Sequence, residues 1–269
     1  MANPEHVKIV RQGREAIAQW RIDNPRVDLD LTWAKLSRVD LSRADLSRVD
    51  LRRANLSEAD LTRANLSVAD LAWANLSGAD FISTNLRRAN LSEANLTSVN
   101  LREAILIWTN LSETNLTRTD FSGTTIGGAT IGGVDLSQTD CLEKAVHQAP
   151  STIGVDTLIR SFRRSGDNLT PALAVFFQGA GVPKELLDAL PRIVAGVVYY
   201  TCLISHGEPD KAFAEKLQES MRVKGVSCWI HEMDYTPGEP TMREIKHEML
   251  RFDKVILVSS TPSLISSFA

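Results

Sequence analysis

Residues 44–63 read ADLSRVDLRRANLSEADLTR, and this stretch repeats a pattern of five residues that decides the fold. A large apolar residue stands at every fifth position from Leu31 to Leu136, which makes 22 repeats. Two residues before it lies a small or β-branched residue, usually with an Asp or Asn between them and a Ser or Thr after the large one. A period of five suits neither a helix nor a strand, so we expect a solenoid whose large and small positions face inward.

Two of these units, AlaAspLeuSerArg at 44–48 and AlaAsnLeuSerGlu at 54–58, resemble the repeats of the pentapeptide-repeat family. The resemblance implies a mainly β fold, a right-handed quadrilateral β-helix with four repeats in each coil, which we place at residues 26–140. Positions four repeats apart would then stack on one face. At the ~4.8 Å spacing of paired strands, the repeats would form a rod roughly 26 Å long.

This stacking predicts that Trp33 and Trp73 share one face of the rod with Arg53 between them. Indole rings and a guanidinium at this spacing can form a contact patch for a partner. They can also be two aromatic rings packed along an arginine stem, with no further role. The sequence leaves both interpretations open.

The charge of the repeats bears on the best-known idea for the family, mimicry of DNA by an acidic rod that binds topoisomerase. Residues 30–140 carry 14 acidic and 11 basic residues, and the whole chain has a formal net charge of −3. This balance of charges is too even for a duplex mimic, and it argues against binding of nucleic acid through overall electrostatic attraction. We therefore interpret the rod as a spacer or docking scaffold with an unknown docking partner.

Other features of the sequence predict a cytoplasmic protein. The longest apolar run, residues 193–204, is far shorter than the roughly 20 residues that cross a bilayer, and no secretory signal is visible at the start. Cys141, Cys202 and Cys228 have no metal-ligand spacing and are too scattered for a disulfide framework. We expect reduced thiols, no cofactor, no metal, and no binding to nucleic acid or membrane.

The open ends of a β-helix expose apolar core and unpaired backbone groups, so we expect both ends to be covered. At residues 1–25, Asn3 as N-cap and Pro4 in the first turn predict one capping helix that ends near Asn24.

After Asp140 the period of five stops, and residues 141–195 are interpreted as a small helical connector. Thr170 with Pro171 predicts the start of one helix that stops at 179–181, and another helix opens at 182–183.

Residues 196–269 alternate between strand and helix patterns. Strands are expected at 197–204, 226–230 and 255–259, with one helix at 210–221 and another around Ile245 and Leu250. This order predicts an open parallel sheet with a ligand crevice at the carboxyl ends of its strands.

Three segments in this region resemble motifs of the TIR family in its bacterial branch: LeuIleSerHis at 203–206, AspTyrThrProGly at 234–238 and LysValIleLeuValSerSer at 254–260. The resemblance implies the N-terminal half of an α/β flavodoxin-like domain, with the sheet order second, first, third. The third strand would be an uncovered edge that invites pairing with another chain. The implied site residues are Ser205 and His206 in the first-motif loop and Asp234, Pro237 and Gly238 in the interaction loop.

TIR domains either associate with one another in signalling or hydrolyse NAD with a glutamate that follows the third strand. That glutamate would lie beyond Ala269, so the resemblance implies no catalytic residue in this sequence. His206 and His231 lie near strand ends, but the sequence assigns them no carboxylate or nucleophile as a catalytic partner, so we do not interpret them as catalytic. The remaining candidates are interpreted as solvated surface charges: Glu239, Glu244 and Glu248.

The leading hypothesis is a cytoplasmic signalling scaffold, in which the rod presents a TIR module that self-associates or binds other TIR domains. The alternative is an NAD hydrolase known here only as a fragment, with NAD as its substrate. A topoisomerase-binding DNA mimic has the least support.

Overall fold

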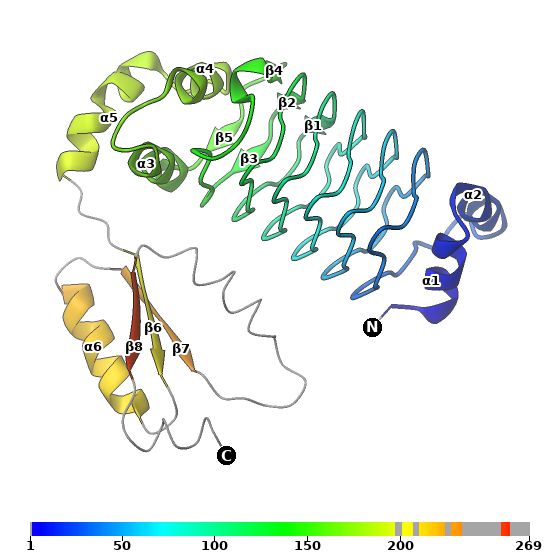
Figure 1. Cartoon of the computed structure of the whole chain (residues 1–269), viewed down its shortest axis with the longest axis horizontal. Coiled ribbons are helices and arrows are strands. Elements are labelled where there is room, and N and C mark those ends of the chain that lie inside the picture. The colour runs from blue at the N-terminus through cyan, green and yellow to red at the C-terminus, as the bar shows by residue number, and fades with distance from the viewer. Residues whose placement is uncertain (1, 197–200, 207–209, 224–226, 233–253, 259–269) are drawn as a thin grey trace. The chain divides into compact units, whose positions relative to one another are not determined.

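The computed structural model describes residues 2–196, 201–206, 210–223, 227–232 and 254–258 (Figure 1). The chain divides into two compact units, Met1–Pro191 and Arg192–Ala269. The first unit contains the stacked coils of the repeats with helices at both ends, and the described residues of the second form a small parallel sheet and a helix.

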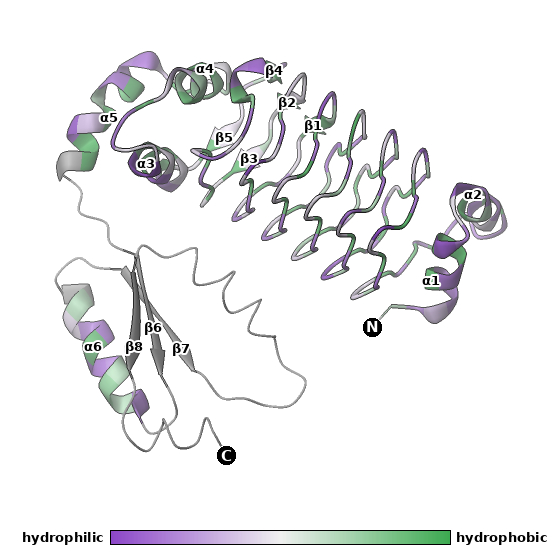
Figure 2. Cartoon of the chain, in the orientation of Figure 1, coloured by the Kyte–Doolittle hydropathy of each residue, from purple (hydrophilic) through white to green (hydrophobic). Residues whose placement is uncertain are grey.

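The repeats form the expected coils, each made of four pentapeptides. Asp30 pairs with Asp50 in parallel, Asp50 pairs with Asp70, and the same offset continues to the pair of Asp120 with Asp140. All 22 large apolar side chains lie buried inside the stack. Hydrophobic and hydrophilic residues accordingly alternate along every coil (Figure 2). The solenoid predicted from the period of five is confirmed.

The backbone of each pentapeptide is hydrogen-bonded to both neighbouring coils. The N–H groups of Leu51 and Arg53 donate to carbonyl groups of the following coil at 2.7 and 2.9 Å, and the N–H of Asp50 donates to the preceding coil at 2.9 Å. The N–H of Ala54 closes a turn on the carbonyl of Leu51 at 3.0 Å. These four bonds recur along the rod and hold the coils in register.

The fifth N–H group explains the Asp or Asn of the repeat. The N–H of Arg52 donates to the side-chain Oδ1 of Asp50 at 3.1 Å, and the same bond forms between Thr117 and Asn115 at 3.1 Å. Asp and Asn at this position therefore supply an acceptor that reaches two residues ahead. The pattern was visible in the sequence, but this reason for it was not.

The second residue after each large one lies in the left-handed region. From Trp33, with φ of 62°, to Gly133, with φ of 69°, 21 such turn residues follow one another, and 17 of them are not glycine. Each turn thus carries a side chain on the outside of the rod despite the backbone cost of a positive φ. Because the coils from Asp30 to Asp140 pair with an offset of four pentapeptides, the turn side chains of successive coils form columns.

At the amino end, the single helix expected at residues 1–25 is wrong, because two helices form: α1, Pro4–Arg11, and α2, Arg14–Asp23. Gly13 separates them with φ of 92°, a conformation that continues no α-helix. Asn3 caps α1 as predicted, and its side chain accepts a hydrogen bond from the N–H of Glu5.

These two helices supply partners to backbone groups of the first coil, which has no coil before it. The N–H of Asp30 donates to Nδ1 of His6, and the carbonyl of Asp30 accepts from the N–H of Asn3. Arg11 donates to the carbonyl of Lys35, and Arg21 donates to two further carbonyl groups of that coil. The unpaired edge is thereby hydrogen-bonded by α1 and α2.

At the carboxyl end, the ladder continues past Asp140 although the repeat sequence stops. β2, Thr125–Gly127, pairs on one side with β1, Ile105–Ile107, and on the other with β4, Val146–His147. β3, Thr130–Ile131, pairs with β5, Thr152–Ile153. A short 3-10 helix, η1, Leu142–Lys144, precedes β4.

Three helices follow: α3, Val155–Arg164, α4, Pro171–Gly179, and α5, Lys184–Gly196. Thr170 caps α4 as predicted, with its hydroxyl accepting from the N–H of Leu173. The helix α3 was not predicted, and it bonds the last coil: the hydroxyl of Ser161 accepts from the N–H of Leu136, and Arg160 donates to the carbonyl of Gly133.

The second unit contains β6, Thr201–His206, α6, Lys211–Val223, β7, Ser227–Glu232, and β8, Lys254–Val258. All pairings are parallel and the order is β7-β6-β8, which is the predicted order of second, first and third strand. The helix expected around Ile245 and Leu250 lies outside the described residues. Within the described part of the chain, no helix has the length and apolar character to cross a membrane.

Candidate functional site

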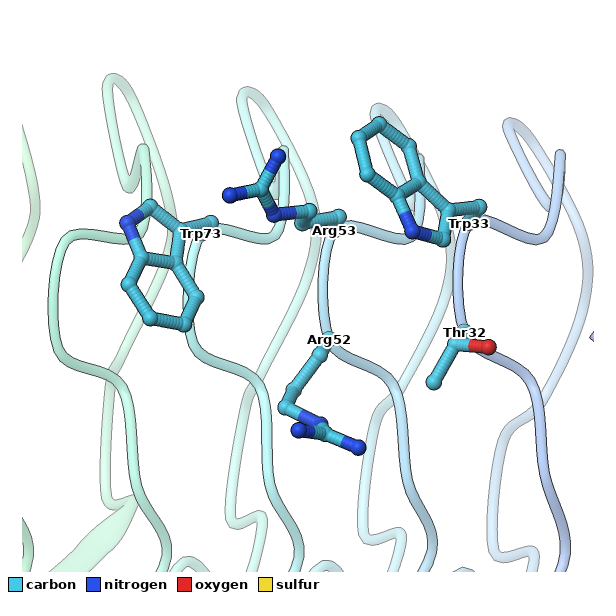
Figure 3. Close-up of a pocket in the computed structure, with 5 residues that line it drawn as sticks. All are labelled: Thr32, Trp33, Arg52, Arg53 and Trp73. Carbon is cyan, nitrogen blue, oxygen red and sulfur yellow. The ribbon is translucent and has the colours of Figure 1, made fainter. Parts of the chain in front are cut away.

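The most distinctive outer surface of the rod is a stack of three side chains from successive coils, Trp33, Arg53 and Trp73 (Figure 3). The Cζ atom of Arg53 lies 4.8 Å from the ring centroid of Trp33 and 5.3 Å from that of Trp73. Both distances fall within the range of cation–π attraction. The predicted shared face is confirmed, and the guanidinium lies between two indole rings.

The stack follows from the coil geometry. All three residues occupy the left-handed turn position, with φ of 62°, 59° and 59°, so their side chains leave the rod in the same direction. The indoles stay accessible, with Trp33 54% and Trp73 46% exposed. Large aromatic surfaces that remain exposed beside a cation are common at protein-binding sites.

One position nearer the amino end of each turn, Arg52 and Thr32 complete a shallow pocket with the stack. Arg52 is engaged in an ion pair with Asp50, with nitrogen–oxygen distances of 2.9 and 2.7 Å, and lies 3.7 Å from Asp70. The hydrogen bonds from Arg52 hold the pKa of the Asp50 carboxyl below its ordinary value. The charge of Arg52 is therefore balanced by the rod itself.

Arg53 differs from two other turn arginines of the first coils, Arg38 and Arg48. Arg38 lies over Glu58 in its column and Arg48 lies over Asp28, each as an ion pair at 2.8 and 2.7 Å. The column of Arg53 offers indoles in place of carboxylates, and across the described residues its guanidinium has no hydrogen bond or ion pair. The four-repeat offset, applied to the sequence, could have predicted this contrast.

The second unit places the predicted first-motif residues at the carboxyl end of β6. In the backbone register, Ser205 lies opposite His231 of β7, and His206 lies opposite Glu232. Glu232 directly follows His231 in the sequence, but it was not predicted as a neighbour of His206; the parallel pairing of the two strands was the signal that could have found it. Ligand crevices of open parallel sheets lie at such strand ends.

The other predicted site residues belong to segments that the structure does not describe. Those of the interaction loop, Asp234, Pro237 and Gly238, lie outside the described residues, as do Glu239, Glu244 and Glu248. Among the residues that the structure does describe, no group of three or more His, Cys, Asp or Glu side chains could hold a metal ion.

Comparison with known families matches two parts of the chain. The family model for pentapeptide repeats matches residues 30–67, 69–106 and 100–138, and the model for the TIR domain matches residues 203–268. A comparison with curated proteins gave no match.

Several solved structures resemble the rod. HetL, a pentapeptide repeat protein of Nostoc sp. strain PCC 7120 involved in heterocyst differentiation regulation, is 30% identical; the match covers 48% of this chain and 77% of HetL, with a TM-score of 0.26. A second pentapeptide repeat protein of Nostoc PCC 7120 is 34% identical over 38% of this chain and 83% of its own, with a TM-score of 0.29. Rfr23 of Cyanothece 51142 is 34% identical over 42% of this chain and 66% of its own, with a TM-score of 0.20. The repeats at residues 30–138 belong to the pentapeptide-repeat family, and residues 203–268 match the TIR domain.

Proposed function

We propose that this protein is a signalling scaffold, in which a pentapeptide-repeat rod presents a TIR module for association with other TIR domains or with a second copy of the chain. The observation that carries the proposal is the joining of the two matched families in one chain. The rod offers a rigid, regularly bonded surface, and strand β8 has only β6 as a described neighbour. A parallel sheet with a free edge can be extended by a strand from another chain.

Light scattering on the full chain over a range of concentrations tests this function. We expect the mass to rise with concentration, and we expect Pro237→Ala in the implied interaction loop to reduce that rise. Pro240→Ala, three residues further on and outside the matching motif, is the control and should leave the rise unchanged. A strict monomer at the highest concentration would contradict the proposal.

NAD hydrolysis is the second candidate. It is favoured by the backbone register that brings Ser205, His206, His231 and Glu232 to one end of the sheet. Incubating the full chain with NAD and measuring nicotinamide separates the two functions. A scaffold releases none above background, whereas release that is lost in Glu232→Gln would replace the scaffold by a hydrolase.

A further inference from the structure

We propose that the stack of Trp33, Arg53 and Trp73 is a docking site for the carboxylate of an acidic side chain on a partner protein. The guanidinium of Arg53 lies between the two indoles, with its Cζ atom 4.8 and 5.3 Å from the ring centroids. Its N–H edge makes no hydrogen bond within the described residues, although a guanidinium has five donors. A carboxylate matches this planar edge with two parallel hydrogen bonds.

The rod itself supplies carboxylates to comparable arginines but not to this one. Arg38 and Arg48 each lie over a carboxylate of the neighbouring coil, and Arg52 is paired with Asp50. Indoles at both neighbouring positions of the column leave Arg53 ordered and without an anion. Such an arrangement lowers the conformational entropy that a partner must overcome on binding.

The surroundings favour a single carboxylate over a polyanion. Asp50 and Asp70 balance the charge of Arg52 beside the site, so Arg53 is the unpaired cation among the residues that line the pocket, which suits one carboxylate and not a chain of phosphates. The rod as a whole is not basic. The exposed indole surfaces on either side of the cation match apolar groups next to an acidic residue. The partner chemistry is therefore a glutamate or aspartate flanked by apolar side chains.

This inference rests on the proposed scaffold function, because it names a partner class for the rod. Its test is separate from the test of self-association, which concerns the TIR module. A failed test here would remove the acidic-partner site and leave the proposed self-association untouched.

The test uses the full chain with ¹⁵N-labelled indoles, whose five tryptophans give five N–H signals in an NMR spectrum. The probe is a short peptide, Gly-Leu-Glu-Leu-Gly with blocked ends, compared with the same peptide carrying Gln in place of Glu. We expect the Glu peptide to shift the signals of Trp33 and Trp73 and to leave that of Trp108, which is 63% exposed in another column, unchanged.

Arg53→Gln should weaken binding of the Glu peptide about tenfold, because it removes the charge-assisted bonds. Arg63→Gln is the matched control, since Arg63 is an exposed turn residue with φ of 59° and no indole in its column, and it should bind as the native chain does. The proposal is overturned if the Gln peptide shifts the same signals equally or if Arg53→Gln binds unchanged. Stronger shifts with a short DNA duplex than with the Glu peptide would also overturn it.

Discussion

The regular coils between Asp30 and Asp120 and the last coil, residues 121–154, share one backbone ladder but differ in their side chains. In the regular coils, an Asp or Asn stands just before each large apolar residue except at Lys35 and Ile105, and it can accept the N–H two residues ahead, as Asn115 does from Thr117 at 3.1 Å. In the last coil, Thr125 and Thr130 stand at this position, and the sides lengthen into β2 and β3. Their partners, β4 and β5, have no repeat sequence.

This difference separates two roles that the repeat combines. Parallel backbone pairing and the left-handed turn form with or without the motif, whereas the Asp or Asn adds an acceptor for the N–H two residues ahead. The last coil is also longer than four pentapeptides. Thr125 pairs with Val146 and Thr130 with Thr152, so each pair is more than 20 residues apart. Where the repeat motif is absent, the last coil is held by hydrogen bonds from α3 and by packing against α4.

Phe121 provides the largest expected contrast between the two regions. Its ring packs edge-on against Phe176 of α4, with centroids 6.3 Å apart, and is fully buried. Phe121→Ala should lower the free energy of unfolding by about 3–5 kcal/mol, because it leaves a cavity and removes this contact. Urea unfolding followed by circular dichroism measures the loss.

Phe81 is the control for this substitution, since it is equally buried but lies in the regular coils. Phe81→Ala should cost less than Phe121→Ala by about 0.5–1.5 kcal/mol, the usual value of an aromatic pair. Equal losses would show that α4 adds nothing to the last coil.

Gly128 gives the next largest effect. Its φ is 61°, and an added Cβ would lie 2.5 Å from the ring of Trp108 in the preceding coil. Gly128→Ala should lower the free energy of unfolding by about 2–4 kcal/mol, from the left-handed backbone and the overpacking together.

Gly123 isolates the backbone part of that cost. It has φ of 67°, but its added Cβ would only touch Glu103 at 3.7 Å, so Gly123→Ala should cost about 1–2 kcal/mol. In a double variant, Trp108→Ala should reduce the loss of stability caused by Gly128→Ala to the level expected for Gly123→Ala. If the double variant stays as unstable as Gly128→Ala, the contact with Trp108 is not the cause.

Much of this architecture could be predicted because it depends on local chemistry repeated many times. The period of five determined the buried positions, and the four repeats of each coil placed Trp33, Arg53 and Trp73 in one column. Asn3 and Thr170 identified helix starts because a side-chain cap acts within a few residues.

The parts that were missed depend on contacts without a local signature. The break at Gly13 was not foreseen, because a single glycine is compatible with a continuous helix. The pairing of β4 with β2 and of β5 with β3 was not foreseen either, since backbone hydrogen bonds demand no particular side chains. In the second unit, Glu232 lies opposite His206 only through the register of two strands that lie apart in sequence.

His147 makes the carboxyl end sensitive to pH. Neither ring nitrogen has a hydrogen-bond partner in the described part of the chain, and the ring packs edge-on against Phe176 at 5.0 Å. Burial lowers the pKa of His147 below its ordinary value, so the unfolded chain binds its proton more readily. Stability is therefore complete above pH about 6.5 and falls as the pH decreases, by at most about 1.4 kcal/mol per pH unit.

His147→Phe should remove this contribution while keeping a ring against α4. Urea unfolding at pH 7.5 and 5.5 checks it: the loss of stability on acidification should be smaller in the variant than in the native chain. An identical loss in both would mean that His147 is not responsible.

Asn115 has the smallest expected effect and tests the role of the motif directly. Asn115→Ala removes the acceptor of the Thr117 N–H, a hydrogen bond of 3.1 Å, and should lower the free energy of unfolding by about 0.5–1.5 kcal/mol. Thr125→Ala is the control, because Thr125 holds the same place in the last coil but its neighbour two residues ahead, Gly127, lies in strand β2. That substitution should cost less. If both substitutions cost the same, the Asp and Asn side chains only interact with solvent. The backbone hydrogen bonds between coils then form the turns without them.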